Sequence, residues 1–214
     1  MSTEASPRHN IPLILSSFIG REEELAHLLA GIAGTRLITL IGSGGCGKTR
    51  LAMEVARHAQ PSFVDGCWLI EFGPLTDPSE LASAIAQALD LREQPGRALT
   101  DTLVEKLFSR NLLLLFDNCE HVIASAAQLA DTLLRACPQL HILATSRERL
   151  NLPGEVSWRV ASLATPAPGA PLSTIQRTEA VRLGERLSVA VVQDSRYDRH
   201  EWSTKALSGA GACI

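Results

Sequence analysis

A chain of 214 residues is long enough to bury one substantial hydrophobic core and a smaller second unit. Its apolar fraction of 45%, charged fraction of 20% and formal net charge of −3 are those of an ordinary folded protein, which argues against a disordered chain or one that coats nucleic acid. No run of about 18 apolar residues is present, and the first ten residues contain no apolar signal core, so we expect a cytoplasmic protein that does not enter a membrane.

The chain begins with a polar arm over residues 1–17, which precedes the first predicted helix. That helix runs from about residue 21 to 33, because apolar side chains recur there at helical spacing and three glutamates lie in the first turn, where the helix dipole favours them. The recurring apolar residues are Leu25, Leu28, Leu29 and Ile32.

Short apolar strands then alternate with helices. We expect strands at 37–41, 67–72, 111–116 and 140–145, and helices at 48–59, 78–91, 98–109 and 120–137. The strands are apolar on both faces, which is typical of a parallel sheet covered by helices on each side. The predicted fold over residues 18–160 is therefore α/β, with a parallel sheet of about five strands sandwiched by helices.

The composition changes after this domain. Residues 161–174 are rich in proline and alanine, which indicates an interdomain linker. Within residues 175–214, one short stretch has helical character and the remainder has no periodic apolar face. We therefore predict a short helix followed by a poorly structured tail.

The segment "GSGGCGKT" at 42–49 lies between a predicted strand and a predicted helix. It satisfies G-x-x-x-x-G-K-[ST], the phosphate-binding loop or Walker A motif, in the context that this motif requires. Glycines let the backbone curl until successive N–H groups point at one anion, and the helix N-terminus adds its positive end. We predict a P-loop NTPase, with a glycine turn that has no ligand as the alternative. The predicted phosphate-binding residues are Gly42, Ser43, Gly44, Gly45, Cys46, Gly47, Lys48, Thr49 and Arg50.

Two side chains of this loop have assigned roles. Lys48 is expected to contact the terminal phosphates, and the Thr49 hydroxyl to be a ligand of Mg²⁺.

Two roles remain open for Cys46: a redox role, or a small side chain that fills space while its backbone contributes to the loop. The five cysteines of the chain are odd in number and include no CxxC pair, which fits reduced thiols better than a disulfide framework or a zinc site.

A second candidate metal residue ends the predicted strand at 111–116. Asp117 follows this apolar run, as in a Walker B element, where an aspartate holds Mg²⁺ through water. Alone, the pattern would equally indicate a turn. Paired with the phosphate-binding loop, it predicts a magnesium site made by Thr49 and Asp117.

Residues for hydrolysis are less clearly marked. Asn118 stands where many related ATPases have a second acid, and an amide cannot accept the proton of a water molecule. Glu120 is the nearest substitute, with a surface or helix-capping role as its alternative. Thr145, Ser146 and Arg147 end another predicted strand, where their side chains would face the ligand crevice. Arg147 would contact a γ-phosphate there, with a helix-start or surface arginine as the alternative.

Four ordered segments together resemble the nucleotide-binding domain of bacterial STAND ATPases. They are "SSFIGREEEL", "LIGSGGCGKTRLA", "LLLLFDNCEH" and "ILATSRERL". These ATPases are NB-ARC-like members of the AAA+ superfamily and occur in large transcriptional regulators of the LuxR and SARP types. The resemblance covers roughly residues 10 to 165 and implies an ATP/ADP switch with Mg²⁺, in which exchange of ADP for ATP permits oligomerisation or release of an effector domain.

The family pattern also extends to the residues before the first helix. By this pattern Gly20 and Arg21 belong to an hhGRE motif that lies near adenine and ribose, with helix-start chemistry as the alternative. Family members continue into a helical domain with a GLPL-type motif and a winged-helix element, which we do not find in this sequence. We therefore expect a truncated or frameshifted relative.

Three functional interpretations remain open. The first is a weakly hydrolysing ATP switch module that also contacts effector domains or associates with itself. The second is a non-catalytic remnant that binds ADP or a partner domain, and the third is a small P-loop kinase. No helix-turn-helix pattern is evident, so we expect no direct DNA binding by this chain.

Overall fold

The computed structural model describes residues 9–13, 18, 20–75, 77–92 and 96–161. The chain divides into two units, and all described helices and strands belong to the first, Met1–Leu13 with Arg21–Ala161. Apart from Ala161, the predicted linker lies outside the described residues, as do the short helix and tail predicted at 175–214. Of the predicted arm, only residues 9–13 are described.

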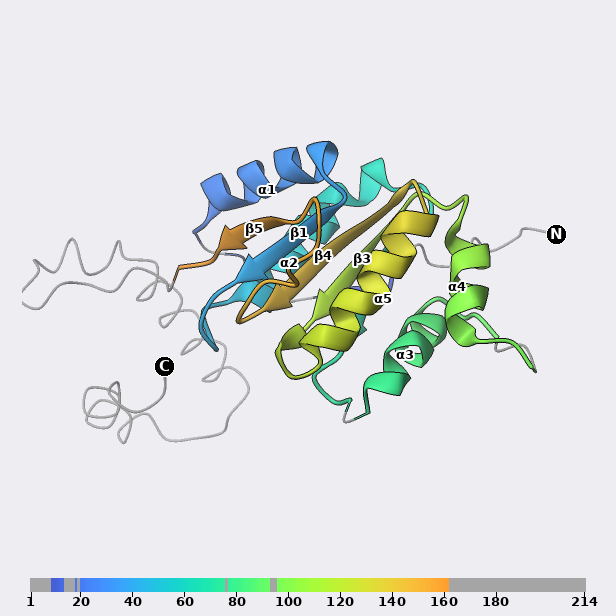
Figure 1. The fold of residues 1–214 in the computed structure, drawn as a ribbon. Helices are drawn as coiled ribbons and strands as arrows, with labels where there is room; N and C mark the ends of the chain where they lie inside the picture. Colours follow the sequence, from blue (N-terminus) through green and yellow to red (C-terminus); the bar gives the residue numbers. More distant parts are fainter. Residues whose placement is uncertain (1–8, 14–17, 19, 76, 93–95, 162–214) are drawn as a thin grey trace, which may run out of the picture. The chain divides into compact units, whose positions relative to one another are not determined.

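Helices and strands alternate through most of this unit, except that two helices follow each other before the third strand and the last two strands have no helix between them (Figure 1). The strands are β1 (Leu37–Ile41), β2 (Cys67–Glu71), β3 (Leu112–Asp117), β4 (Leu140–Ser146) and β5 (Val156–Arg159). The α-helices are α1 (Glu22–Gly34), α2 (Lys48–Ala59), α3 (Leu81–Ala88), α4 (Leu99–Leu107) and α5 (Ile123–Ala136). Short 3₁₀ turns occur at Gln60–Ser62 (η1), Pro78–Glu80 (η2) and Cys119–His121 (η3).

The five strands form one parallel sheet in the order β2-β3-β4-β1-β5. This confirms the predicted α/β fold with a parallel sheet of about five strands. In this order β4 lies between β1 and β3, and the register pairs Ile41 of β1 with Ser146 of β4. Because all strands run the same way, the residues that follow β1, β3 and β4 meet at one edge.

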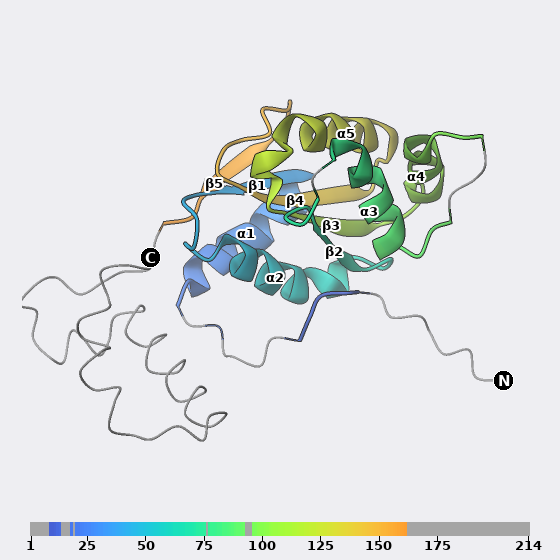
Figure 2. The same cartoon turned by 90° about the horizontal axis from the view of Figure 1, so that it is seen from below.

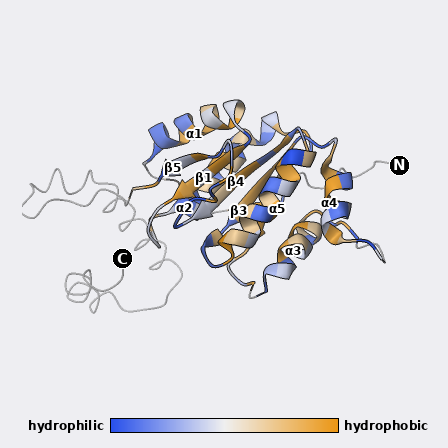
Figure 3. Cartoon of the chain, in the orientation of Figure 1, coloured by the Kyte–Doolittle hydropathy of each residue, from blue (hydrophilic) through white to orange (hydrophobic). Residues whose placement is uncertain are grey.

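Helices cover both faces of the sheet. α1 and α2 lie on one face, and α3 and α5 lie on the other with α4 beside them (Figure 2). The strands between these layers are predominantly hydrophobic (Figure 3). β3 is buried at every position, which is the expected result for a central strand covered from both sides.

Some predicted boundaries differ from the structure. The segment predicted as a helix at 78–91 is a 3₁₀ turn followed by α3, and it ends before Asp90, whose φ of 51° is in the left-handed region. The helix predicted at 120–137 begins at Ile123, after another 3₁₀ turn. The sequence did not locate β5, because an exposed or half-buried edge strand has no apolar run.

Residues 9–13 contribute to the open edge of β2. The Asn10 side chain donates from Nδ2 to the Leu69 carbonyl at 2.8 Å and accepts from the Leu69 N–H at 2.6 Å. It therefore satisfies backbone groups that an edge strand would leave unpaired. Within the described part of the chain, none of the helices has the length and apolar character needed to cross a membrane.

Shortening a side chain of β3 should test the packing of this sheet. Leu114 is fully buried in the core, so Leu114→Ala should lower the free energy of unfolding by about 3 kcal/mol. Val64 is 63% exposed, and Val64→Ala should change it by less than about 0.5 kcal/mol. Urea unfolding followed by circular dichroism measures both, and equal small effects would contradict the described core.

Candidate functional site

The glycine loop links the end of β1 to the start of α2. Gly45 and Gly47 have φ values of 74° and 88°, a backbone conformation in which other residues are strained. A Cβ atom on Gly42 would lie 2.7 Å from the Val160 carbonyl oxygen and 2.8 Å from Cys46 Sγ. The local backbone therefore requires glycine at 45 and 47, and close packing against Val160, directly after β5, requires it at 42.

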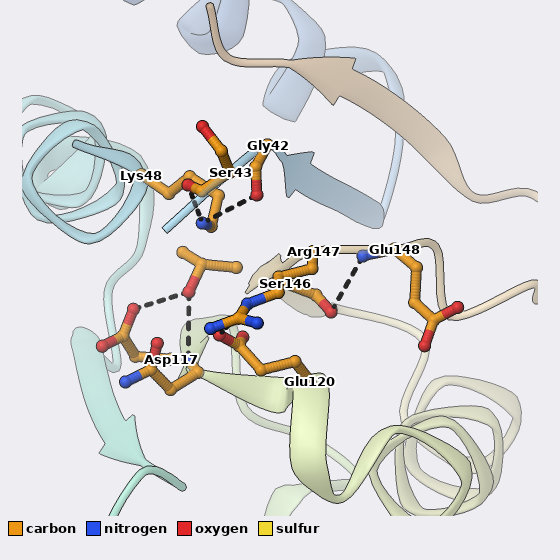
Figure 4. Close-up of polar contacts among 10 residues, drawn as sticks. Gly42, Ser43, Lys48, Asp117, Glu120, Ser146, Arg147 and Glu148 are labelled. Atoms are coloured by element: carbon orange, nitrogen blue, oxygen red, sulfur yellow. Dashed lines mark hydrogen bonds and ion pairs between the residues drawn. The ribbon is translucent and has the colours of Figure 1, made fainter. Parts of the chain in front are cut away.

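The Lys48 side chain folds back over this loop. Its Nζ donates hydrogen bonds to the carbonyl oxygens of Gly42 at 3.1 Å and Ser43 at 3.0 Å (Figure 4). The residue is only 7% exposed, and its ammonium forms no ion pair with any described residue. A buried cation that contacts only neutral carbonyls is strongly attractive to an anion.

Asp117 lies at the carboxyl end of β3 and receives two hydroxyl hydrogen bonds on one oxygen. Thr49 donates to Asp117 Oδ1 at 2.7 Å, and Thr145 donates to the same atom at 2.6 Å. The Thr145 hydroxyl also accepts a hydrogen bond from the Asn118 N–H at 3.0 Å. The structure thus brings together Thr49 and Asp117, the two residues predicted to hold the metal.

Thr145 was not among the predicted site residues. Its side chain was expected to face the crevice, because it ends an apolar strand, but no binding or catalytic role was assigned to it. The strand order explains its position, since β4 lies between the strand that precedes the loop and the strand that carries Asp117. Its hydroxyl fixes the orientation of the Asp117 carboxylate.

These residues fit a magnesium ion that a nucleotide carries. Mg²⁺ prefers oxygen ligands, keeps several waters and is commonly held by one or two protein oxygens together with substrate phosphates. Thr49 Oγ1 and the second carboxylate oxygen of Asp117 would supply the protein part of such a site. Among the described residues, no group of three or more His, Cys, Asp or Glu side chains could hold a metal by itself.

Glu120 and Arg147 meet at the same edge of the sheet. Arg147 Nε lies 3.3 Å from Glu120 Oε1, and the side chains are 68% and 22% exposed, respectively. The turn that carries Arg147 is closed by a hydrogen bond of 3.3 Å from the Glu148 N–H to Ser146 Oγ (Figure 4). The predicted water-orienting and phosphate-sensing residues therefore form an ion pair with each other.

The Asn118 side chain lies against Gly73, in the segment after β2. The residue's φ of 62° is left-handed, and a Cβ atom on Gly73 would lie 3.0 Å from its Nδ2 atom. The amide side chain therefore packs against the segment after β2. Among the described residues, this amide makes no side-chain hydrogen bond to Asp117 or Glu120.

Arg21 contacts the phosphate-binding loop through its side chain. Its Nη2 donates to the carbonyl oxygens of Cys46 at 2.8 Å and Ala161 at 2.6 Å, and its Nε lies 3.6 Å from Glu24 Oε2. Arg21 thus joins the loop to the end of the described domain. Its contact with adenine and ribose stays a prediction, as does that of Gly20, which has a left-handed φ of 71°.

The remaining two predicted loop residues differ in surroundings. Cys46 is buried, and its carbonyl accepts the Arg21 hydrogen bond, which favours a structural role through its backbone. Arg50 is half-buried in the first turn of α2.

Two cavities lie at the opposite edge, near the amino ends of β1 and β4. Their volumes are about 330 Å³ and 390 Å³, and His141 and Ala33 line both. Burial lowers the pKa of His141, so its ring is neutral at pH 7. Neither cavity is lined by a predicted phosphate or metal residue.

Residues 32–152 match the family model of the AAA domain, and the chain belongs to this family.

The chain is 43% identical over 132 residues to the HTH-type transcriptional regulator Rv0890c of Mycobacterium tuberculosis, covering 62% of this chain and 15% of that protein. It is 39% identical over 158 residues to the uncharacterized protein Rv0894 of the same organism, covering 74% of this chain and 40% of the relative. The regulatory protein AfsR of Streptomyces griseus is 31% identical over 156 residues, with 65% and 15% covered. The chain thus spans 15% to 40% of the length of these relatives.

Among solved structures, the fold is similar to that of the Signal Transduction ATPase with Numerous Domains (STAND) protein PH0952 from Pyrococcus horikoshii, which has a tetratricopeptide repeat sensor. The TM-score is 0.51 at 16% sequence identity, and the match covers 72% of this chain and 24% of that one. The fold is therefore that of a P-loop NTPase of the AAA type.

Adding one methyl group to the loop should destabilise the domain. Gly42→Ala would force a Cβ atom against the Val160 carbonyl, so we expect it to lower the free energy of unfolding by about 1–3 kcal/mol. Gly34→Ala is the matched control, because a Cβ atom there meets nothing within 4 Å and should change stability by less than about 1 kcal/mol. Urea unfolding measures both, and an unaffected Gly42→Ala would contradict the described packing of the loop.

The buried thiol of Cys119 should make the free energy of unfolding fall as the pH rises in the alkaline range. Burial, followed by the negative charges of Asp117 and Glu120, raises the pKa of its thiol above the ordinary range. An unfolded thiol deprotonates near pH 8.5 while the folded one stays protonated, so this stabilisation is present at neutral pH and is lost as the pH rises above about 8.5.

Unfolding measurements between pH 7 and 10 test this dependence. In the wild type, Cys119 should contribute a loss of about 2 kcal/mol by pH 10, and Cys119→Ala should remove that part of the slope. An identical pH slope in the variant would show that the thiol is not shielded.

Proposed function

We propose that this domain binds ATP and ADP with Mg²⁺ and serves as the nucleotide-responsive module of a STAND-type, NB-ARC-like transcriptional regulator of the LuxR or SARP type. The buried ammonium of Lys48 carries the proposal, since it lies in a glycine loop at the start of α2 and contacts only neutral carbonyl oxygens. A nucleotide's terminal phosphates are the anion that such a loop recognises. Membership in the AAA domain family supports the same ligand.

The side chains around the loop have complementary tasks in this proposal. Backbone N–H groups of residues 43–49 and the positive end of α2 bind the phosphate oxygens, and Lys48 neutralises the terminal phosphates. Thr49 and Asp117 hold the accompanying ion, and Thr145 keeps the Asp117 carboxylate in position. When bound, Mg²⁺ supplies charge neutralisation of the phosphates.

We expect any ATP hydrolysis to be slow, because the candidate residues for activating water are engaged in other contacts. Glu120 is engaged by Arg147, and the Asn118 side chain packs against Gly73, so neither is set up to activate water. The same two observations favour a second candidate function, a nucleotide-binding switch that does not hydrolyse ATP. In either case the bound nucleotide, more than turnover, would carry the signal.

The relatives suggest where such a module acts. Two of the three are named as regulators and exceed this chain several-fold in length. By this analogy the domain would contact effector or regulatory domains, or other copies of itself, in the cytoplasm. We assign no DNA contact to the described residues.

Removing the Lys48 ammonium should strongly weaken nucleotide binding. Lys48→Ala should lower the affinity for MgATP at least about thirtyfold, because a buried charge contact is lost. Lys106→Ala is the control, since Lys106 is exposed in α4 and pairs with Glu105. Titration calorimetry with circular dichroism as a folding check measures both, and unchanged affinity in Lys48→Ala would refute the proposed site.

Asp117→Asn should weaken ATP binding in the presence of Mg²⁺ and have a smaller effect in EDTA, because its carboxylate acts through the ion. Phosphate release measured in the same samples separates the two candidate functions. Slow release that disappears in Asp117→Asn supports the ATPase, and no release by the wild type supports the non-hydrolysing switch.

A further inference from the structure

The ion pair between Glu120 and Arg147 lies at the same edge of the sheet as the glycine loop. Glu120 belongs to η3, which follows β3, and Arg147 directly follows β4. The guanidinium lies beside the glycine loop, because a Cβ atom on Gly44 would lie 3.8 Å from Arg147 Nη2. One end of Arg147 therefore faces Glu120, and the other lies beside the loop that we propose holds the phosphates.

Glu120 depends on this arginine for charge compensation. Its Oε1 pairs with Arg147 Nε, whereas its Oε2 is buried and has no hydrogen-bond partner among the described residues. A partly buried carboxylate with an unsatisfied oxygen is costly unless a cation stays near it. Withdrawal of Arg147 would leave this negative charge inside the site.

A γ-phosphate presents a competing anion to the same guanidinium. Arg147 is 68% exposed and therefore has room to change its position. Guanidinium groups pair with carboxylate and phosphate through the same forked N–H donors, so contact with phosphate weakens contact with Glu120. ADP has no γ-phosphate and leaves the ion pair intact.

We propose that Glu120 is a positioning residue that sets the preference between ADP and ATP by competing with the γ-phosphate for Arg147. This inference rests on the proposed nucleotide-binding function. The intact ion pair favours the ADP-bound domain, and ATP binds only at the expense of that pair. Glu120 thereby raises the ATP concentration at which the domain changes state.

Affinities for ATP and ADP, measured by calorimetry on the full chain with Mg²⁺, test this inference. Glu120→Gln keeps the shape of the side chain and removes its charge, so it should raise the affinity for ATP relative to ADP by about two- to fivefold, the range expected for a partly exposed ion pair. A non-hydrolysable ATP analogue should show the same shift, which separates binding from turnover. Asp131→Asn is the matched control, because Asp131 pairs with Arg135 on the exposed face of α5, and it should leave the ratio unchanged.

A double-mutant cycle shows whether Glu120 acts through Arg147. Arg147→Ala should lower ATP affinity more than ADP affinity, and in that background Glu120→Gln should change the ratio by clearly less than it does in the wild type. An equal change in both backgrounds would mean that Glu120 merely repels phosphate, and it would overturn the proposal. So would a Glu120→Gln variant with an unaltered ratio.

The Lys48→Ala variant keeps the two levels of inference apart. If it retains wild-type affinity, the proposed function itself is wrong. If it loses binding while Glu120→Gln leaves the ratio unaltered, the nucleotide site stands and only the role of Glu120 is refuted.

Discussion

One carboxylate oxygen, Asp117 Oδ1, joins three elements at the edge of the sheet. It accepts hydrogen bonds from Thr49 at the start of α2 and from Thr145 near the end of β4, while Asp117 itself ends β3. Breaking the bond from Thr145 would leave its buried hydroxyl without an acceptor, which is costly in a dry environment. This shared acceptor holds the glycine loop at a fixed place relative to the candidate metal ligand, and the rest of the site depends on that placement.

Much of this arrangement could be predicted from local patterns. The strand at 37–41 and the helix at 48–59 have the predicted bounds, because an apolar run followed by a glycine loop and an amphipathic segment specifies them with few alternatives. The approach of Thr49 to Asp117 was also predicted, since both follow parallel strands whose carboxyl ends share one edge. The family to which the chain belongs agrees with these motifs.

Other features depend on tertiary contacts that no local pattern encodes. The role of Thr145 requires the strand order, in which β4 separates β1 from β3. The side-chain bonds of Arg21 link residues 25 and 140 positions apart in sequence, and β5 is held mainly by pairing with β1. The pairing of Glu120 with Arg147 likewise joins two side chains that the sequence suggested for separate tasks. Gly42 likewise has a tertiary role, because it packs closely against the Val160 carbonyl, in addition to its expected role beside phosphate.

The central proposal is that the glycine loop at residues 42–49 is the main binding site for the triphosphate. Amide chemical shifts recorded by NMR during titration of the full chain with MgATP test it most directly. The account predicts that the largest changes occur at Gly42 to Thr49, with smaller ones at Asp117 and Thr145. Changes centred instead on the cavities around His141 and Ala33, or no changes at saturating nucleotide, would contradict it.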